Sequence, residues 1–301
     1  MDEASFCAKH SVDASEPLAG TVGLRRTWIL LQDHGPWHEK AFKQSDLPDK
    51  VKRHLKELGA EFIDDDEKAS NTVVLIRNSE RREVEQKKLF VVQAGAERPS
   101  IQQFEWETPS DILKLPLRCT LAGEAAGTPV SNLLLVCTNG SRDRCCAKFG
   151  MPLYRALSEQ APELVWRSSH LGGHRFAPVM AWLPYGVYYG RVPLEACSRI
   201  LADIEAGELT LEYFRGRSTF PKPAQIAESL LRAGEQERAV SAYRFLDAET
   251  LADGRVRVGL ERSADRARID VMYQVTPSGT AVMPSCGEDA HEPVHAYARV
   301  V

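Results

Sequence analysis

Short apolar runs separated by polar breaks organise the first region of the chain, up to residue 122. Apolar and β-branched residues predict strands over 27–34, 72–78, 87–95 and 101–107. Between the first two, residues 47–60 (LPDKVKRHLKELGA) have the apolar spacing of an amphipathic helix. The polar breaks DDDEKASN (64–71) and NSERRE (78–83) predict solvated loops. Region 1–122 is therefore expected to be an α/β unit.

A second region, 123–219, alternates strands and helices more clearly. Residues 131–137 (SNLLLVC) predict a buried strand, 163–169 a short strand, and 178–184 with 186–192 a hairpin; helices are expected over 147–160 and 193–209. This order is typical of a small α/β sandwich with a mixed sheet. The first region has a similar order, so a degenerate internal repeat is one explanation, although its counterpart loop QDHGPWHEK contains no cysteine.

The third region, 220–301, follows the proline break FPKP. Residues 224–243 predict a helix broken at its glycine, and 254–262, 267–275 and 279–285 predict a three-stranded meander. The final residues, EDAHEPVHAYARVV, are expected to form a tail. We expect this helix-plus-meander region to be an appendage used for packing or partner docking.

Composition excludes several classes of function. Of 301 residues, 43% are hydrophobic and 27% charged, and the net charge of −4 favours neither nucleic acid nor an anionic membrane as a partner. No apolar run approaches the 18 or so residues that span a bilayer. The acidic segment MDEASFCAKHSVDASEP lacks the basic-then-apolar order of a signal peptide. The expected location is the cytoplasm.

Seven cysteines are few for a disulfide scaffold. In a reducing cytoplasm, they are better explained as metal ligands, redox thiols or buried apolar side chains. Cys7, Cys119, Cys197 and Cys286 stand alone in the sequence. Cys197 lies in an amphipathic helical pattern and is expected in the core.

The richest chemistry lies in two loops. CTNGSRDRCC contains Cys137 at the end of the predicted strand, then Cys145 and Cys146. Cys146 begins or precedes the next helix, where the helix dipole and neighbouring Arg142, Arg144 and Lys148 would favour a thiolate. In HLGGH, His170 and His174 flank two glycines, which predict a loop that can approach a bulky group closely.

Two explanations fit these residues: a metal centre, or buried thiols and ordinary hydrogen-bonded imidazoles. A structural zinc site takes two cysteines and two histidines, but its cysteines are normally two to four residues apart. Eight residues separate Cys137 from Cys146. A [2Fe–2S] cluster is wider, and two imidazole ligands would raise its potential.

At these residues the sequence resembles the sucrase/ferredoxin-like family, a branch of the thioredoxin-like [2Fe–2S] ferredoxins. The resemblance rests on CTNGSRDRCCAKFG, SSHLGGHRFAPVMAWLPYGVYYGRV and YFRGRS, and extends to PLAGTVG and HGPWHEKAFKQSDLP. It implies a thioredoxin-like middle domain and a [2Fe–2S] cluster held by Cys137, Cys146, His170 and His174, with Cys145 as the alternative to Cys146.

The resemblance thus implies an electron carrier or redox sensor that serves an unknown redox partner protein and is not itself an enzyme. A structural zinc-binding interaction module is the first alternative. A thiol–disulfide oxidoreductase using Cys145 and Cys146 is the second, although the usual C-x-x-C spacing is missing. Sucrase activity has no support, because no pair of carboxylates can be placed across a sugar site.

The arginines near these motifs have two explanations. They either surround the centre and tune it by hydrogen bonds, or they are solvated loop residues and ion pairs. The five are Arg142, Arg175, Arg191, Arg215 and Arg217.

Overall fold

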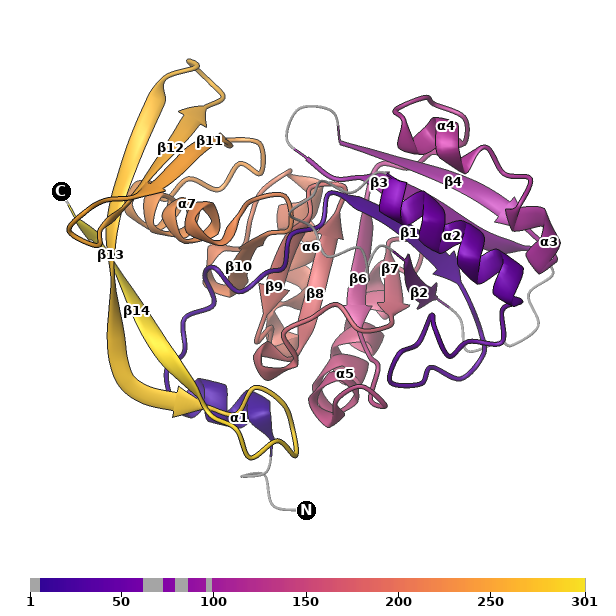
Figure 1. Cartoon of the computed structure of the whole chain (residues 1–301), viewed down its shortest axis with the longest axis horizontal. Helices are drawn as coiled ribbons and strands as arrows, with labels where there is room; N and C mark the ends of the chain where they lie inside the picture. Colours follow the sequence, from indigo (N-terminus) through magenta and orange to yellow (C-terminus); the bar gives the residue numbers. More distant parts are fainter. Residues whose placement is uncertain (1–5, 62–72, 79–85, 96–98, 301) are drawn as a thin grey trace.

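A ten-stranded sheet forms the body of the protein (Figure 1). The computed structural model describes residues 6–61, 73–78, 86–95 and 99–300. The predicted loop 64–71, and the predicted loop 78–83 from residue 79 on, lie outside the described residues. In spatial order the strands are β10 (Phe214–Arg217), β9 (Val187–Gly190), β8 (Val179–Leu183), β6 (Leu133–Cys137), β7 (Val165–Ser168), β2 (Val73–Arg77), β1 (Thr27–Gln32), β3 (Lys87–Gln93), β4 (Ser100–Trp106) and β5 (Thr128–Pro129).

The two halves of this sheet have the same order of strands. In the second half, β6 runs parallel to β7 and antiparallel to β8, which pairs with β9. In the first half, β1 runs parallel to β2 and antiparallel to β3, which pairs with β4. One helix connects each parallel pair: α5 (Arg144–Gln160) in the second half and α2 (Asp49–Glu61) in the first. The predicted α/β fold is confirmed by this order of strands and helices, whereas the repeat and the boundary at 122 remain predictions.

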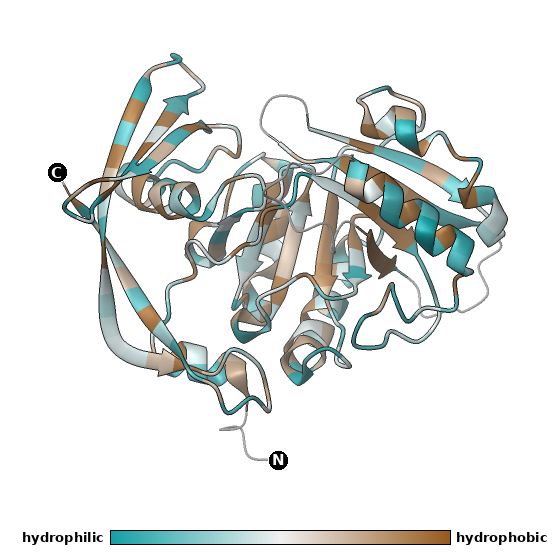
Figure 2. Ribbon diagram, in the orientation of Figure 1, coloured by the Kyte–Doolittle hydropathy of each residue, from teal (hydrophilic) through white to brown (hydrophobic). Residues whose placement is uncertain are grey.

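The halves join edge to edge through β2 and β7, which pair antiparallel over two residues of each strand. Side chains on one face of the sheet form a core shared by both halves, including Trp28, Phe90 and Trp166. Along β6, alternate residues point to opposite faces: Leu135 and Cys137 join this shared core. The apolar colouring of the central strands in Figure 2 follows this burial.

The opposite face of the sheet is covered by helices. In the second half these are α5 and α6 (Cys197–Glu205), and the first half has α2, with short α3 (Pro109–Ile112) and α4 (Leu117–Leu121) nearby. Cys197 is the first residue of α6 and is buried, so its predicted core position is confirmed. Single-turn helices η3 (His174–Phe176), η4 (Leu194–Ala196) and η5 (Leu211–Tyr213) complete this part. Within the described ranges, no helix is both long and apolar enough to cross a bilayer.

The C-terminal region has one helix and a sheet of four strands. Helix α7 (Lys222–Glu235) ends just after Gly234. The helix predicted over 224–243 was wrong beyond that point, because residues 236–242 form no helix and Tyr243 begins a strand. The strands are β11 (Tyr243–Thr250), β12 (Val256–Arg262), β13 (Arg268–Val282) and β14 (Glu292–Val300). The predicted tail was wrong, because β14 pairs with β13. The prediction of a separate third strand over 279–285 was also wrong, because this segment is the end of the long strand β13. Strand β14 is largely exposed, so it lacks the apolar run that identifies a strand.

The β13–β14 ribbon links the C-terminal sheet to the other end of the molecule. Figure 1 shows the loop between these strands lying beside α1 (Cys7–Asp13), near the N-terminus. At the start of α1, Phe6 and Cys7 pack with Cys145 and Ala177. Cys286, in the loop between β13 and β14, is partly buried and belongs to the same cluster. Residues from both ends of the chain therefore lie against the loops in which the sequence predicted a metal centre.

Candidate metal centre

The loop after β6 holds two of the candidate ligands. Cys137 is the last residue of the strand, and Cys146 lies in the first turn of α5; their side chains are 2% and 1% exposed. Asp143 caps the helix by accepting a hydrogen bond from the Cys145 N–H at 2.8 Å. The cap sets where the helix begins and hence which way each cysteine points.

Gly150 allows α5 to lie against the end of β6. A Cβ at this position would stand 2.0 Å from the carbonyl oxygen of Cys137. Cys146 precedes Gly150 by four residues and so lies on the same side of the helix. The close approach of α5 to β6 at Gly150 therefore brings the thiols of Cys137 and Cys146 together.

The loop after β7 holds both histidines. Since β6 and β7 are parallel neighbours, their carboxyl ends meet at one edge of the sheet. Gly172 and Gly173 have φ values of +96° and +72°, a conformation that favours glycine. A Cβ on Gly173 would stand 2.2 Å from Nη2 of buried Arg215. The expected glycine loop is therefore present, with an arginine packed against it.

Three of the four predicted ligands converge. His170 Nδ1 lies 3.9 Å from Cys137 Sγ and 3.8 Å from Cys146 Sγ, and these ligand atoms all lie within 4.8 Å of one another. His174 is outside this tight group. Its ring centroid is 5.3 Å from that of His170, with the planes inclined at 32°.

His174 presents a nitrogen with no protein partner. Its Nε2 lies 2.7 Å from the Pro284 carbonyl oxygen, which can only accept, so Nε2 carries the proton. Burial lowers the pKa of His174, which favours the neutral ring. Its Nδ1 is buried and without a hydrogen-bond partner. A neutral imidazole with its second nitrogen held by a carbonyl is the usual form of a histidine ligand.

The side chains of Cys137 and Cys146 share a hydrogen bond. A hydrogen bond from Cys146 lowers the pKa of Cys137 well below its ordinary value, and donating that bond raises the pKa of Cys146. Arg144 and Lys148, which were expected to favour a Cys146 thiolate, lie over the Phe6 ring.

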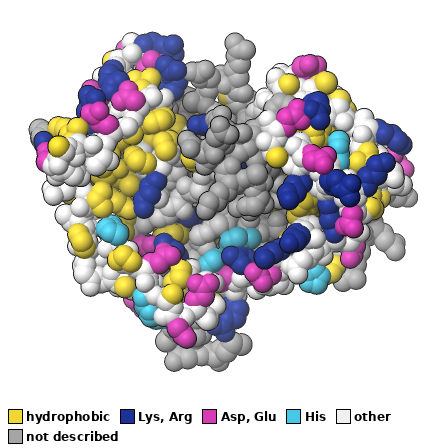
Figure 3. All heavy atoms as spheres, in the orientation of Figure 1, with side chains coloured by type: hydrophobic (Ala, Val, Ile, Leu, Met, Phe, Trp, Pro, Cys, Tyr) yellow, Lys and Arg dark blue, Asp and Glu magenta, His cyan; other side chains and the backbone are white. Residues whose placement is uncertain are grey.

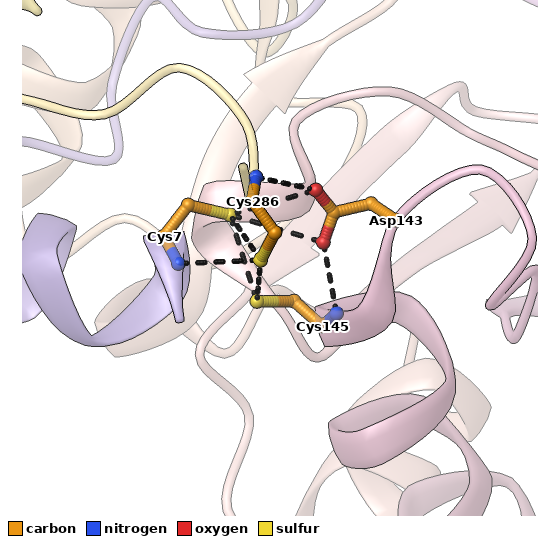
Figure 4. A group of neighbouring side chains, drawn as sticks. All are labelled: Cys7, Asp143, Cys145 and Cys286. Carbon is orange, nitrogen blue, oxygen red and sulfur yellow. Dashed lines mark hydrogen bonds between the residues drawn. The ribbon is translucent and has the colours of Figure 1, made fainter. Parts of the chain in front are cut away.

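Cys145 belongs to a different group. Although predicted as the alternative to Cys146, its sulfur lies 3.5 Å from that of Cys7 and 3.3 Å from that of Cys286 (Figure 4). Adjacent helical residues point about 100° apart, so two neighbouring cysteines cannot face one centre. Cys7 and Cys286, which stand alone in the sequence, are thus neighbours in space. In the sequence, the adjacency of Cys145 and Cys146 indicated that they belong to two separate groups. No sequence signal indicated that Cys7 and Cys286 are the partners of Cys145.

Most of the five arginines are bound elsewhere. Arg215 contacts the histidine loop, donating to Gly172 O at 3.4 Å, and burial lowers its pKa to about 10. The others bind acidic, hydroxyl or carbonyl groups: Arg142 binds Glu39, Arg175 binds Glu16 and Glu292, Arg191 binds Ser11, and Arg217 binds Glu228 and Val240.

A cleft of about 490 Å³ reaches His170 from the surface. Among the described residues of its lining are four basic side chains and one carboxylate: Arg25, Lys40, Lys43 and Arg142, with Glu39. Figure 3 shows Lys and Arg side chains gathered close to histidine on one face of the molecule. His170 is partly exposed, whereas both thiols of the group are buried.

Comparison with known proteins places these motifs in one family. Residues 18–216 match the family described as sucrase/ferredoxin-like. Two structures of the thioredoxin-like [2Fe–2S] ferredoxin from Aquifex aeolicus are similar at 20% identity. A cysteine-to-serine variant covers 29% of this chain and 100% of its own (TM-score 0.26), and another structure of that ferredoxin covers 30% and 94% (TM-score 0.27). No curated protein matches the chain.

Proposed function

The chain belongs to the sucrase/ferredoxin-like family, and we propose that it is an electron-transfer or redox-sensing protein that carries one [2Fe–2S] cluster. The proposed ligands are Cys137, Cys146, His170 and His174. It would act in the cytoplasm on a redox partner protein, without nucleic acid or membrane and without a substrate of its own.

The observation that carries this proposal is a set of two thiols and two imidazoles gathered at one edge of the sheet. Cys137 Sγ, Cys146 Sγ and His170 Nδ1 lie within 4.8 Å of one another, and the His174 ring lies beside that of His170. A [2Fe–2S] cluster with mixed ligands takes two thiolates on one iron and two imidazoles on the other. The unpartnered Nδ1 of His174 agrees with a ligand position, because a buried polar atom without a partner costs free energy.

The cluster would supply one-electron chemistry, and the residues around it would set its properties. Neutral imidazoles in place of thiolates reduce the negative charge of the centre and raise its potential. The Pro284 carbonyl orients His174 through Nε2. Partly exposed His170 gives the partner its approach through the basic cleft, so an acidic partner surface is favoured.

Anaerobic purification of the full chain tests the proposal. We expect two irons and two acid-labile sulfides per chain, with the visible absorption of a [2Fe–2S] centre. Cys137→Ser and Cys146→Ser should lose the iron, while Cys197→Ser, which changes a buried cysteine outside the group, should retain it. Nitrogen hyperfine couplings in the reduced protein should report two imidazoles. A colourless protein, or full iron in Cys137→Ser, would refute the assignment.

A structural zinc site is the second candidate function. The three donor atoms of Cys137, Cys146 and His170 lie within 4.8 Å of one another, which also suits a single tetrahedral ion. Zinc there would be redox-silent, and the protein would act as a scaffold. Stoichiometric zinc that disappears in Cys137→Ser, with no iron after growth in iron-rich medium, would favour this candidate.

A thiol–disulfide oxidoreductase remains the weakest candidate. It would require a bond between Cys145 and Cys146, whose sulfurs belong to different groups. Alkylation followed by mass spectrometry under non-reducing conditions would detect that bond.

A further inference from the structure

A second group of thiols lies behind the candidate cluster site (Figure 4). Cys7, Cys145 and Cys286 come from α1, the start of α5 and the loop between β13 and β14. Their sulfurs form a triangle with sides of 3.3, 3.5 and 3.6 Å, and the carboxylate of Asp143 lies 3.8 Å from Cys7 Sγ. We propose that these three cysteines bind one zinc ion, with Asp143 as the oxygen ligand.

The size of the triangle fits a single ion. Zinc binds cysteine sulfur at about 2.3 Å, so sulfurs at the corners of a tetrahedron lie about 3.8 Å apart. The observed sides are within about half an ångström of that value. A planar three-sulfur site would need about 4.0 Å at the same bond length, so the ion lies above the sulfur plane, where a fourth ligand completes the tetrahedron.

The kinds of donor select zinc among the common ions. Thiolates favour zinc, Cu(I) and iron–sulfur clusters over magnesium or calcium. A carboxylate oxygen is a poor ligand for Cu(I) but an ordinary one for zinc. Three sulfurs this close together suit one metal better than a cluster, whose cysteines bind different irons.

Hydrogen bonds hold the carboxylate in place. Asp143 is 4% exposed, and it accepts from the main-chain N–H groups of Cys145 at 2.8 Å and Cys286 at 2.9 Å. Ser285 Oγ adds a third donor at 3.1 Å. Cys7 and Cys145 are fully buried. The group is therefore fixed by bonds between segments that are 136 or more residues apart.

Such a site would fasten both ends of the chain over the candidate cluster. Cys7 belongs to α1, and Cys286 to the loop whose Pro284 carbonyl accepts from His174 Nε2. Asp143 Oδ2 also lies 3.8 Å from that nitrogen. Zinc would keep this loop over His174 whether the neighbouring group holds an iron–sulfur cluster or another metal.

Metal analysis of the full chain tests the proposal. We expect one zinc per chain, measured beside iron by mass spectrometry. Zinc-edge X-ray absorption should show three sulfurs at about 2.3 Å and one oxygen at about 2.0 Å. A first shell of nitrogen and oxygen only, absence of zinc after growth in zinc-rich medium, or a disulfide between two of these cysteines would overturn it.

Serine variants assign the zinc to these residues. Cys7→Ser and Cys286→Ser should each lose at least nine-tenths of the zinc and keep their iron, whereas the exposed control Cys119→Ser keeps both. Zinc retained in Cys7→Ser and Cys286→Ser but lost in Cys137→Ser would overturn this inference and place zinc in the neighbouring group. A wild-type protein that contains zinc but no iron would count against the proposed function, and the zinc proposal would still be tested by the serine variants.

Hydrogen exchange gives an independent readout of the fastening role. Removal of zinc should increase exchange at least tenfold in residues 6–14 and 283–291, while the central strands stay protected. Unchanged exchange in both segments would contradict the role assigned to the ion.

Discussion

The contact between α5 and the end of β6 can be tested with one methyl group. In Gly150→Ala, the added Cβ would stand 2.0 Å from the carbonyl oxygen of Cys137. Ordinary contact between such atoms begins near 3.5 Å, so the helix and strand must separate by roughly 1.5 Å. The obstructing atom belongs to the main chain of a buried strand, so no side chain can rotate away.

The energetic consequence follows from two opposing terms. Alanine is favoured over glycine inside a helix by about 1 kcal/mol. Overpacking of a well-packed interior costs about 1–3 kcal/mol and sometimes more, and here backbone meets backbone. We expect a net loss of about 1–3 kcal/mol in the free energy of unfolding. Because Cys146 lies one turn from Gly150, it would also move away from Cys137, and bound iron should fall.

Thermal unfolding and iron analysis measure the two effects together. Gly234→Ala is the matched control, since Gly234 is also helical but its Cβ would meet only the end of the Arg299 side chain, at 3.4 Å. That variant should be neutral or more stable by up to about 1 kcal/mol. If Gly150→Ala melts at the wild-type temperature with full iron, the proposed contact does not hold the thiols together.

Three further predictions concern other parts of the chain. Glu228→Gln should cost about 3–5 kcal/mol in urea unfolding, because it leaves the buried Arg217 guanidinium, now 2.8 Å from Glu228, without its counter-charge; wild-type stability would contradict this. Gly173→Ala should lower bound iron, because its φ of +72° and its approach to Arg215 both exclude a Cβ, and full occupancy in iron analysis would refute that reason. His170→Cys should keep a cluster with a lower potential in redox titration, since a thiolate adds negative charge; an unchanged potential would argue against His170 as a ligand.

Local sequence signals determined much of the central domain. Five consecutive buried residues end at Cys137, the apolar spacing after it indicated α5, and the glycine pair indicated a loop between His170 and His174. These features depend on short-range physics: which side chains a strand or helix buries, and which φ angles a residue tolerates. They sufficed for the α/β prediction and for the candidate cysteines and histidines, whereas the thioredoxin-like domain and the ligand set came from the family resemblance.

Only the tertiary structure could reveal which residues meet across the molecule. The triangle of Cys7, Cys145 and Cys286 brings together positions 138 and 141 residues apart, and no local pattern encodes that meeting. Strand β14 was missed because it is exposed, and its pairing with β13 depends on the partner strand. Which group of ligand atoms Cys145 joins, and which Cys146 joins, depends on the rotation of α5 against the sheet. The cysteine triangle, the pairing of β14 and the rotation of α5 all depend on packing between distant elements. A sequence pattern indicates which residues are buried but not which residues they contact.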